Sequence, residues 1–256
     1  MTERVGISGS NGFLGKRLTE RLEQSGYDVI RLGREGSTEN STVVFDLAAY
    51  GNMPGHKGDP KEIYQANLMR VIESAEGFEG KFIYVSSSSV MLPQDTHYSI
   101  SKRAAEQYLQ SSDIKCVIAR PFSVTGVGDQ EGHLIPKLID SAMTGSEMPF
   151  VPDPVHDFID VQDIVNALVI LAGNVDAHVG EVFDLGTGIE TSNIEVAATV
   201  SEVVGSSPNV KVVESMRKYD TDKWKADTKK MKSLGWKPQK TLRQSIEEMY
   251  AKRKNT

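Results

Sequence analysis

The sequence has little cysteine, few aromatic residues and no long apolar run. Of its 256 residues only Cys116 is a cysteine, so no disulfide can form within the chain. No apolar stretch approaches the ~18 residues that a membrane-spanning helix needs. The first predicted strand starts at about residue 4, which we expect to leave no room for a signal peptide. We therefore expect a cytoplasmic protein that has no membrane partner.

An excess of basic residues is also absent. Lysine and arginine together number 29 against 35 acidic residues, and the formal net charge is −6. Nucleic-acid binding requires a basic face that neutralises phosphates, so we expect no nucleic-acid partner. We also expect no metal site. The length is sufficient for one large or two small domains with a sizeable core.

The N-terminal stretch combines a strand, a glycine turn and a helix. Val5–Ser8 reads as a buried strand, and glycines follow at every third position, Gly9, Gly12 and Gly15. Leucines four residues apart then predict one face of a helix: Leu14, Leu18 and Leu22. Glycines let a phosphate approach the backbone, and a helix N-terminus offers N–H groups and partial positive charge. The pattern favours dinucleotide binding over an ordinary strand-to-helix turn.

The second predicted strand, Tyr27–Leu32, bears on the choice of cofactor. An acid at the end of this strand binds ribose hydroxyls in dinucleotide folds, whereas a nearby arginine suits a 2′-phosphate. This chain carries Arg31 and Arg34 and has no aspartate at the strand end. These residues favour NADP over NAD, while Glu35 keeps NAD open, and both arginines could also be solvated surface residues.

The connector that follows is short. Residues 35–42 lead directly to a predicted buried strand, Val43–Ala49. A crossover between parallel strands takes about a dozen residues. We therefore expect the third element of the usual sheet to be missing or reduced.

Candidate catalytic residues follow the strand predicted at Lys81–Val85. Ser86–Ser89 end this strand, and a predicted helix, His97–Gln110, carries Tyr98 and Lys102 on one face. In a hydride-transfer site the tyrosine would move the proton and the lysine would lower its pKa. A serine would hydrogen-bond the reacting oxygen.

Position, not spacing, singles out this tyrosine–lysine pair. The same spacing recurs at Tyr219/Lys223 and at Tyr250/Lys254. Only Tyr98 and Lys102 follow a serine-bearing strand end, which is where ligands bind in doubly wound sheets.

Further elements are predicted along the chain. A helix at about 61–76 places the polar Asn67 on an apolar face, where it is either a satisfied core amide or a site residue. The other predicted helices and strands are a strand at 115–119, helices at 132–145 and 161–173, a strand at 181–185, a helix from Ser192 and a final helix at 241–251.

In this order, the motifs resemble those of the extended short-chain dehydrogenase/reductases, the NAD(P)-dependent sugar-nucleotide epimerases, dehydratases and ketoreductases. The matching segments are Gly9–Gly15, Phe45–Ala49, Asn67, Val85–Val90, Tyr98 with Lys102, Arg120–Val124, Phe158–Asp163 and Leu234–Pro238. The resemblance implies a Rossmann-type, doubly wound parallel α/β sheet with a small C-terminal substrate-binding α/β lobe. It implies a cofactor domain of residues 1–122, to which about 157–187 return, and a substrate lobe of about 123–156 and 188–256.

The resemblance also implies site residues. Ser87, with Ser86 as the fallback, Tyr98 and Lys102 would be catalytic. The cofactor-binding residues would be Gly9, Asn11, Gly12, Phe13, Leu14, Gly15, Arg31, Arg34, Ala48, Ala49, Tyr98, Lys102 and Pro121. The substrate-binding residues would be Tyr50, Asn67, Ser123, His156 and Arg217. Helices at about 61–76 and 98–110 would form a homodimer contact.

Three departures narrow the expected reaction. The loop from Val90 to Tyr98 is short, which implies an abbreviated lid. His156 stands where the family usually has an arginine, and a neutral imidazole binds a diphosphate less well. Ser88 and Ser89 replace the acids of dehydratases, so dehydration is disfavoured. We expect a 4-epimerase or 4-keto reductase acting on a nucleotide-sugar with NADP or NAD; the alternative is a non-catalytic NAD(P)-binding sensor or scaffold.

Overall fold

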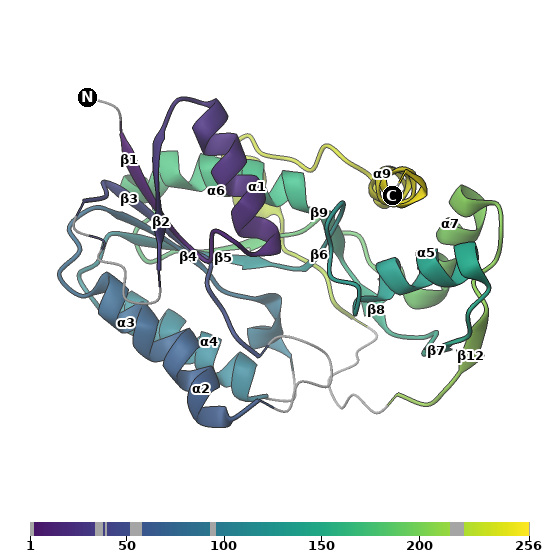
Figure 1. Cartoon of the computed structure of the whole chain (residues 1–256). Helices are drawn as coiled ribbons and strands as arrows, with labels where there is room; N and C mark the ends of the chain where they lie inside the picture. Colours follow the sequence, from purple (N-terminus) through teal and green to yellow (C-terminus); the bar gives the residue numbers. More distant parts are fainter. Residues whose placement is uncertain are drawn as a thin grey trace.

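A parallel sheet of six strands forms the centre of the molecule (Figure 1). The computed structural model describes residues 3–33, 38, 40–51, 58–92, 96–215 and 223–255. In spatial order the strands are β10 (Val182–Leu185), β5 (Cys116–Pro121), β4 (Lys81–Val85), β3 (Val43–Asp46), β1 (Arg4–Ser8) and β2 (Asp28–Leu32). Every neighbouring pair runs parallel. This arrangement confirms the predicted doubly wound α/β class.

Helices cover both faces of the sheet (Figure 1). On one face lie α1 (Phe13–Gln24) and α6 (Val161–Asn174). On the other lie α3 (Arg70–Ala75) and α4 (His97–Gln110). Side chains alternate along each strand, as they must in a sheet that is covered on both sides. In β4, for example, Ile83 contributes to one core and Phe82 to the other.

The sheet ends at β2, as the short connector predicts. Within the described ranges, β1 is the one strand that pairs with β2. β1 in turn lies between β2 and β3, so that Ser8 is level with both Leu32 and Asp46. The glycine turn therefore starts beside the end of β3.

The helix predicted at 61–76 is interrupted. It consists of α2 (Pro60–Tyr64), a π-helical turn (Gln65–Met69) and α3. Such turns insert a residue into a helix and occur frequently at functional sites. The predicted strand 43–49 is also shorter than expected, because β3 ends at Asp46 and the chain then runs as a loop.

A second, smaller core lies beside the sheet layer (Figure 1). Apolar side chains of three helices and a short strand make this core. These elements are α5 (Leu134–Thr144), β7 (Met148–Phe150), α7 (Asn193–Val204) and α9 (Leu242–Lys254). The strand β12 (Val210–Val212) pairs with β7.

Short strands connect the two cores. They are β6 (Ser123–Thr125), which pairs with β9 (Phe158–Asp160), and β8 (Val155–His156), which pairs with β11 (Thr191–Ser192). The sequence pattern did not predict them, because strands of two or three residues show no periodicity. The remaining elements are a helix, α8 (Lys229–Ser233), and two 3₁₀ turns (Ser88–Met91 and Val175–Ala177). In the described part of the chain, no helix has both the length and the apolarity that crossing a membrane requires.

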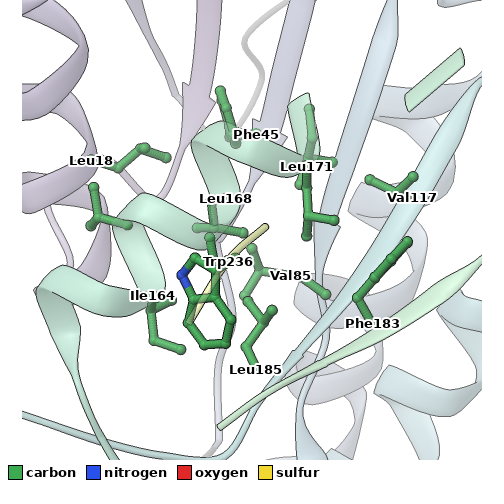
Figure 2. Close-up of a cluster of buried hydrophobic side chains, with 14 of the residues drawn as sticks. Leu18, Phe45, Val85, Val117, Ile164, Leu168, Leu171, Phe183, Leu185 and Trp236 are labelled. Carbon is green, nitrogen blue, oxygen red and sulfur yellow. The ribbon is translucent and has the colours of Figure 1, made fainter. Parts of the chain in front are cut away.

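Two motifs noted in the sequence, residues 158–163 and 234–238, contact each other in the fold. Trp236 packs beside Ile164 and Leu168 of α6 (Figure 2). Its indole N–H donates to the Asp163 carbonyl oxygen at 3.3 Å. The carboxylate of Asp163 accepts the backbone N–H groups of Gln239 at 3.0 Å and of Lys240 at 3.1 Å. The segments 158–163 and 234–238 therefore fix the C-terminal part of the chain to α6.

Replacing Trp236 with alanine should lower the free energy of unfolding by about 3–5 kcal/mol, because the indole is buried and its loss leaves a cavity. Trp236→Phe keeps most of the volume and should cost less. Urea unfolding followed by circular dichroism measures both variants. A loss below about 1 kcal/mol for the alanine variant would contradict this role.

Candidate active site

The carboxyl ends of β1, β3, β4 and β5 meet at one edge of the sheet. Because the strands are parallel and aligned, the segments that follow them lie together. These segments carry most of the residues selected from the sequence. Ligands of open α/β sheets bind at this edge.

The glycine turn between β1 and α1 is shaped by close backbone contacts. Gly9 has a φ of 67°, and a Cβ there would lie 2.8 Å from the Ala48 nitrogen. A Cβ on Gly15 would lie 2.8 Å from Gly9 C and Ser10 Cα. Asn11 and Gly12 are exposed, Phe13 and Leu14 are half-buried, and no side chain caps α1. The first N–H groups of α1 therefore remain available to bind a phosphate.

The loop after β3 is held by buried polar groups. The Ser8 hydroxyl donates to the Asp46 carboxylate and accepts the N–H groups of Leu47 at 3.1 Å and Ala48 at 3.2 Å. Arg70 binds Asp46 through two nitrogens, at 2.7 and 3.1 Å, and also donates to the Ala48 carbonyl oxygen at 3.1 Å. The conformation of Leu47 and Ala48 is thus set by side chains from β1, β3 and α3.

Asn67 fixes the next part of the loop. Its carbonyl oxygen accepts the Tyr50 N–H at 2.8 Å, and its amide nitrogen donates to Tyr50 O at 2.9 Å. The same nitrogen donates to the Ser101 hydroxyl of α4 at 3.1 Å. Asn67 is fully buried, whereas Tyr50 beside it is exposed. The role of Asn67 in substrate binding stays a prediction.

Ser87 and Tyr98 face each other across the site. The Ser87 hydroxyl forms a hydrogen bond with Tyr98 and accepts the Ser89 N–H at 3.2 Å. Burial of the phenol raises the pKa of Tyr98 to about 12, although the bond to Ser87 opposes the rise. Tyr98 is therefore protonated at neutral pH. The hydroxyl of Ser86 is buried and makes no hydrogen bond in the described structure, so Ser87 fits the predicted role better than Ser86 does.

Lys102 lies about one helical turn after Tyr98 on α4 and is buried. Its ammonium group donates to the Val85 carbonyl oxygen at 2.7 Å and lies 4.5 Å from the centre of the Tyr84 ring. Burial lowers the pKa of Lys102 to about 8, while Asp46 raises it. Burial is the largest influence on the Tyr98 phenol and sets its pKa above the usual value, so the lowering of this pKa by Lys102 stays a prediction.

Residues after β5 form another wall. Pro121 is buried at the end of this strand. The Ser123 hydroxyl lies 3.1 Å from His156 Nδ1, and the His156 ring packs in tilted orientation against Phe158 and Trp224, with centroid distances of 5.3 and 5.4 Å. Ser123 and His156 are thus brought together, although they are far apart in the sequence.

Of the three arginines selected from the sequence, Arg31 is the one within the described residues. Arg31 is exposed and forms an ion pair with Glu23 at 2.7 Å. Arg34, like Glu35, and Arg217 lie outside the described residues. Ala48 is half-buried and Ala49 is exposed at the start of the loop.

Sequence reasoning missed several residues of this edge. Asp46 and Arg70 are the most buried charged pair beside the loop, and Ser8 and Ser101 complete their network. The signal for Asp46 was an acid at the end of an apolar strand. Arg70 follows Asn67 by three residues and lies on the same side of the helix. The helix is interrupted by a π-turn there, and periodicity did not predict that interruption.

The residues present fit a dinucleotide cofactor. The glycine turn leaves a cradle in which a Cβ on Gly12 would lie 3.2 Å from Gly9 O, and the uncapped α1 supplies N–H donors beside it. Among the described side chains, no group of three or more His, Cys, Asp or Glu residues could hold a metal ion.

Comparison with known proteins gives consistent matches. The model of the NAD dependent epimerase/dehydratase family matches residues 5–186. GDP-6-deoxy-D-mannose reductase from Pseudomonas aeruginosa is 27% identical, covering 96% of this chain and 95% of that protein.

Solved structures share the fold. MoeE5 in complex with UDP-glucose and NAD has a TM-score of 0.88 at 24% identity, covering 99% of this chain and 100% of the other. RMD from Pseudomonas aeruginosa complexed with NADPH has a TM-score of 0.83 at 22% identity, covering 98% of each chain.

Gly15→Ala should weaken binding of NADH and NADPH, because the added methyl group forces α1 away from the glycine turn. We expect a loss of at least about tenfold in affinity, which corresponds to about 1.4 kcal/mol of binding free energy. Gly173→Ala in α6 is the control, because its Cβ meets open space and alanine favours a helix. Fluorescence titration measures affinity, and equal affinity in both variants would contradict the prediction.

Proposed function

The chain belongs to the NAD-dependent epimerase/dehydratase family, within the extended short-chain dehydrogenase/reductases, and we propose that it transfers hydride at the 4-position of a nucleotide-linked sugar. The observation that carries the proposal is the juxtaposition of Ser87, Tyr98 and Lys102 at the strand edge that also holds the glycine turn. The proposed reaction is 4-keto reduction or 4-epimerisation.

In the proposed mechanism, Tyr98 transfers the proton and Ser87 holds the reacting oxygen. A nicotinamide cofactor, when bound, supplies or accepts the hydride. Because the pKa of Tyr98 is raised to about 12, its phenol is protonated and can donate to a ketone oxygen as this becomes an alcohol. The Ser87 hydroxyl hydrogen-bonds both the phenol and the incoming oxygen. Lys102, buried beside them, provides positive charge that stabilises the phenolate left behind.

The proposed cofactor site consists of the glycine turn, Ala48, Ala49 and Pro121. The uncapped start of α1 supports a diphosphate at Gly12 to Gly15. In the described structure Arg31 is engaged in an ion pair with Glu23 and is not positioned to bind a 2′-phosphate. The arginines in the sequence nevertheless favour NADP, and we propose NADP or NAD as the cofactor.

The proposed substrate site is formed by Tyr50, Ser123 and His156, and by Arg217 outside the described residues. Ser123 and His156 are hydrogen-bonded, and the His156 ring contacts Trp224. These contacts support a polar and aromatic wall of the proposed substrate site. Residues 1–122 with about 157–187 would bind the cofactor, and about 123–156 with 188–256 the sugar nucleotide. The reductase and the UDP-glucose complex among the similar proteins support this substrate class.

The direct test is an assay with nucleotide-sugars. The purified protein is first denatured, and any nicotinamide dinucleotide that it releases is identified by mass spectrometry. It is then incubated with UDP-, GDP- and CDP-linked sugars and their 4-keto derivatives, with NADPH or NADH added. Retained NAD and interconversion of 4-epimers indicate an epimerase, while consumption of NADPH with a 4-keto sugar indicates a reductase. Absence of both reactions over the panel would contradict the proposed function.

Tyr98→Phe should lower turnover by about 10²–10⁴-fold, because it removes the proton donor and keeps the ring. Cofactor affinity should change little. Tyr250→Phe is the matched control, since Tyr250 has the same spacing to a lysine but lies in α9. Steady-state kinetics separates the variants, and near-normal turnover of Tyr98→Phe would contradict the assigned role.

A homodimer is proposed through α2–α3 and α4. These helices pack side by side and expose Met69 and Ile100, at 42% and 37%. Met69→Glu together with Ile100→Glu should convert a dimer into a monomer, because charge is costly in an apolar interface. Met143→Glu in α5, at a site 42% exposed, is the control. Sedimentation velocity measures the mass; a wild-type monomer at micromolar concentration would contradict the proposal.

A further inference from the structure

A buried ion pair lies behind the proposed cofactor site. Arg70 contacts Asp46 at 2.7 Å, and the two side chains are 12% and 1% exposed. Burial of such charges costs desolvation energy, so a pair of this kind is weak evidence for a stabilising role. The other hydrogen bonds of these two side chains indicate a different role for the ion pair.

The pair controls both peptide groups of Ala48. Arg70 donates to Ala48 O at 3.1 Å, and the Ser8 hydroxyl, which donates to Asp46, accepts the Ala48 N–H at 3.2 Å. Two residues later, Asn67 bonds both the N–H and the carbonyl of Tyr50. The main chain of 48–50 is thus bound at both ends by the π-turn and α3.

Ala48 also touches the glycine turn. Its nitrogen would lie only 2.8 Å from a Cβ on Gly9, so the two backbones are in direct contact. A shift of Ala48 therefore displaces either the turn that would bind the diphosphate or the loop that would line the rest of the dinucleotide. The two walls of the site meet at the residue that the ion pair fixes.

The geometry points to Asp46 and Arg70 as positioning residues for the nicotinamide cofactor, which they serve by fixing the loop 47–50 against the glycine turn. This role rests on the proposed cofactor site, and it extends that site to two residues that would not themselves touch the cofactor. Asp46 and Arg70 act through Ser8, Leu47 and Ala48.

The same pair acts electrostatically on Lys102. The charged and titratable groups near it are Asp46 of β3, Arg70 of α3, Glu106 of α4 and Tyr84 of β4. Asp46 and Glu106 raise the pKa of Lys102 and Arg70 lowers it, while burial brings it to about 8. Removing the charge of Asp46 should therefore lower this pKa, and removing that of Arg70 should raise it.

The experiment compares Asp46→Asn, Arg70→Met and the double variant with wild type. Asp163→Asn is the control, because Asp163 is an equally buried carboxylate that accepts backbone N–H groups of the C-terminal segment rather than of this loop. Fluorescence titration measures the affinity for NADH and NADPH, and circular dichroism verifies the fold. We expect each single variant to lose at least about tenfold in affinity and Asp163→Asn to lose less than about twofold.

If a single variant does not fold, the double variant decides, since it leaves no unpaired buried charge. It should fold and bind the cofactor at least about tenfold more weakly, because Ala48 O has lost its donor and Ser8 its charged acceptor. Normal affinity in the folded double variant would overturn the inference. Equal weakening in Asp163→Asn would do the same, because it would indicate general destabilisation.

The pH profile of turnover gives an independent readout. Catalysis that needs cationic Lys102 falls as pH rises through the pKa of that lysine. The alkaline limb should therefore move to lower pH in Asp46→Asn and to higher pH in Arg70→Met. Shifts in the same direction would contradict the electrostatic part of the role. Failure of wild type to bind either nucleotide would instead overturn the proposed function.

Discussion

Parallel pairing of the strands is the constraint on which the site depends. Because β1, β3, β4 and β5 run in the same direction and end level, the loops that follow them must share one edge. Four segments that are distant in the sequence therefore meet there: the glycine turn, the loop 47–50, the serines after β4 and Pro121. The helices on both faces hold this edge in place, and the C-terminal segment is fastened to α6 through Trp236 and Asp163.

Burial then sets the chemistry at that edge. It keeps the Tyr98 phenol protonated, with a pKa of about 12, and brings the Lys102 pKa to about 8. Acid and cation are therefore adjacent at neutral pH. The buried Asp46 offsets part of the cost of the ammonium group and at the same time orders the backbone that faces the glycine turn. Electrostatics and positioning thus share residues.

The sequence predicted the sheet class, the missing edge strand and the grouping of Ser87 with Tyr98, since these follow from strand order and helical spacing. It did not predict the interruption at Gln65–Met69, because a π-turn shifts the face of a helix without altering its apolar content. Asp46 and Arg70 were missed because their pairing is a tertiary contact across 24 residues. The raised pKa of Tyr98 was not predicted, because burial cannot be read from spacing.

We propose that the residues at this edge of the sheet direct hydride transfer between a nicotinamide cofactor and a nucleotide-linked sugar. Single-turnover reaction of the protein with 4-deuterated NADPH or NADH and a nucleotide-linked 4-keto sugar, followed by mass spectrometry and NMR of the product, tests it most directly. The account predicts one deuterium at C4 of the sugar, delivered to one face. Tight cofactor binding with unlabelled, unreduced sugar would contradict it.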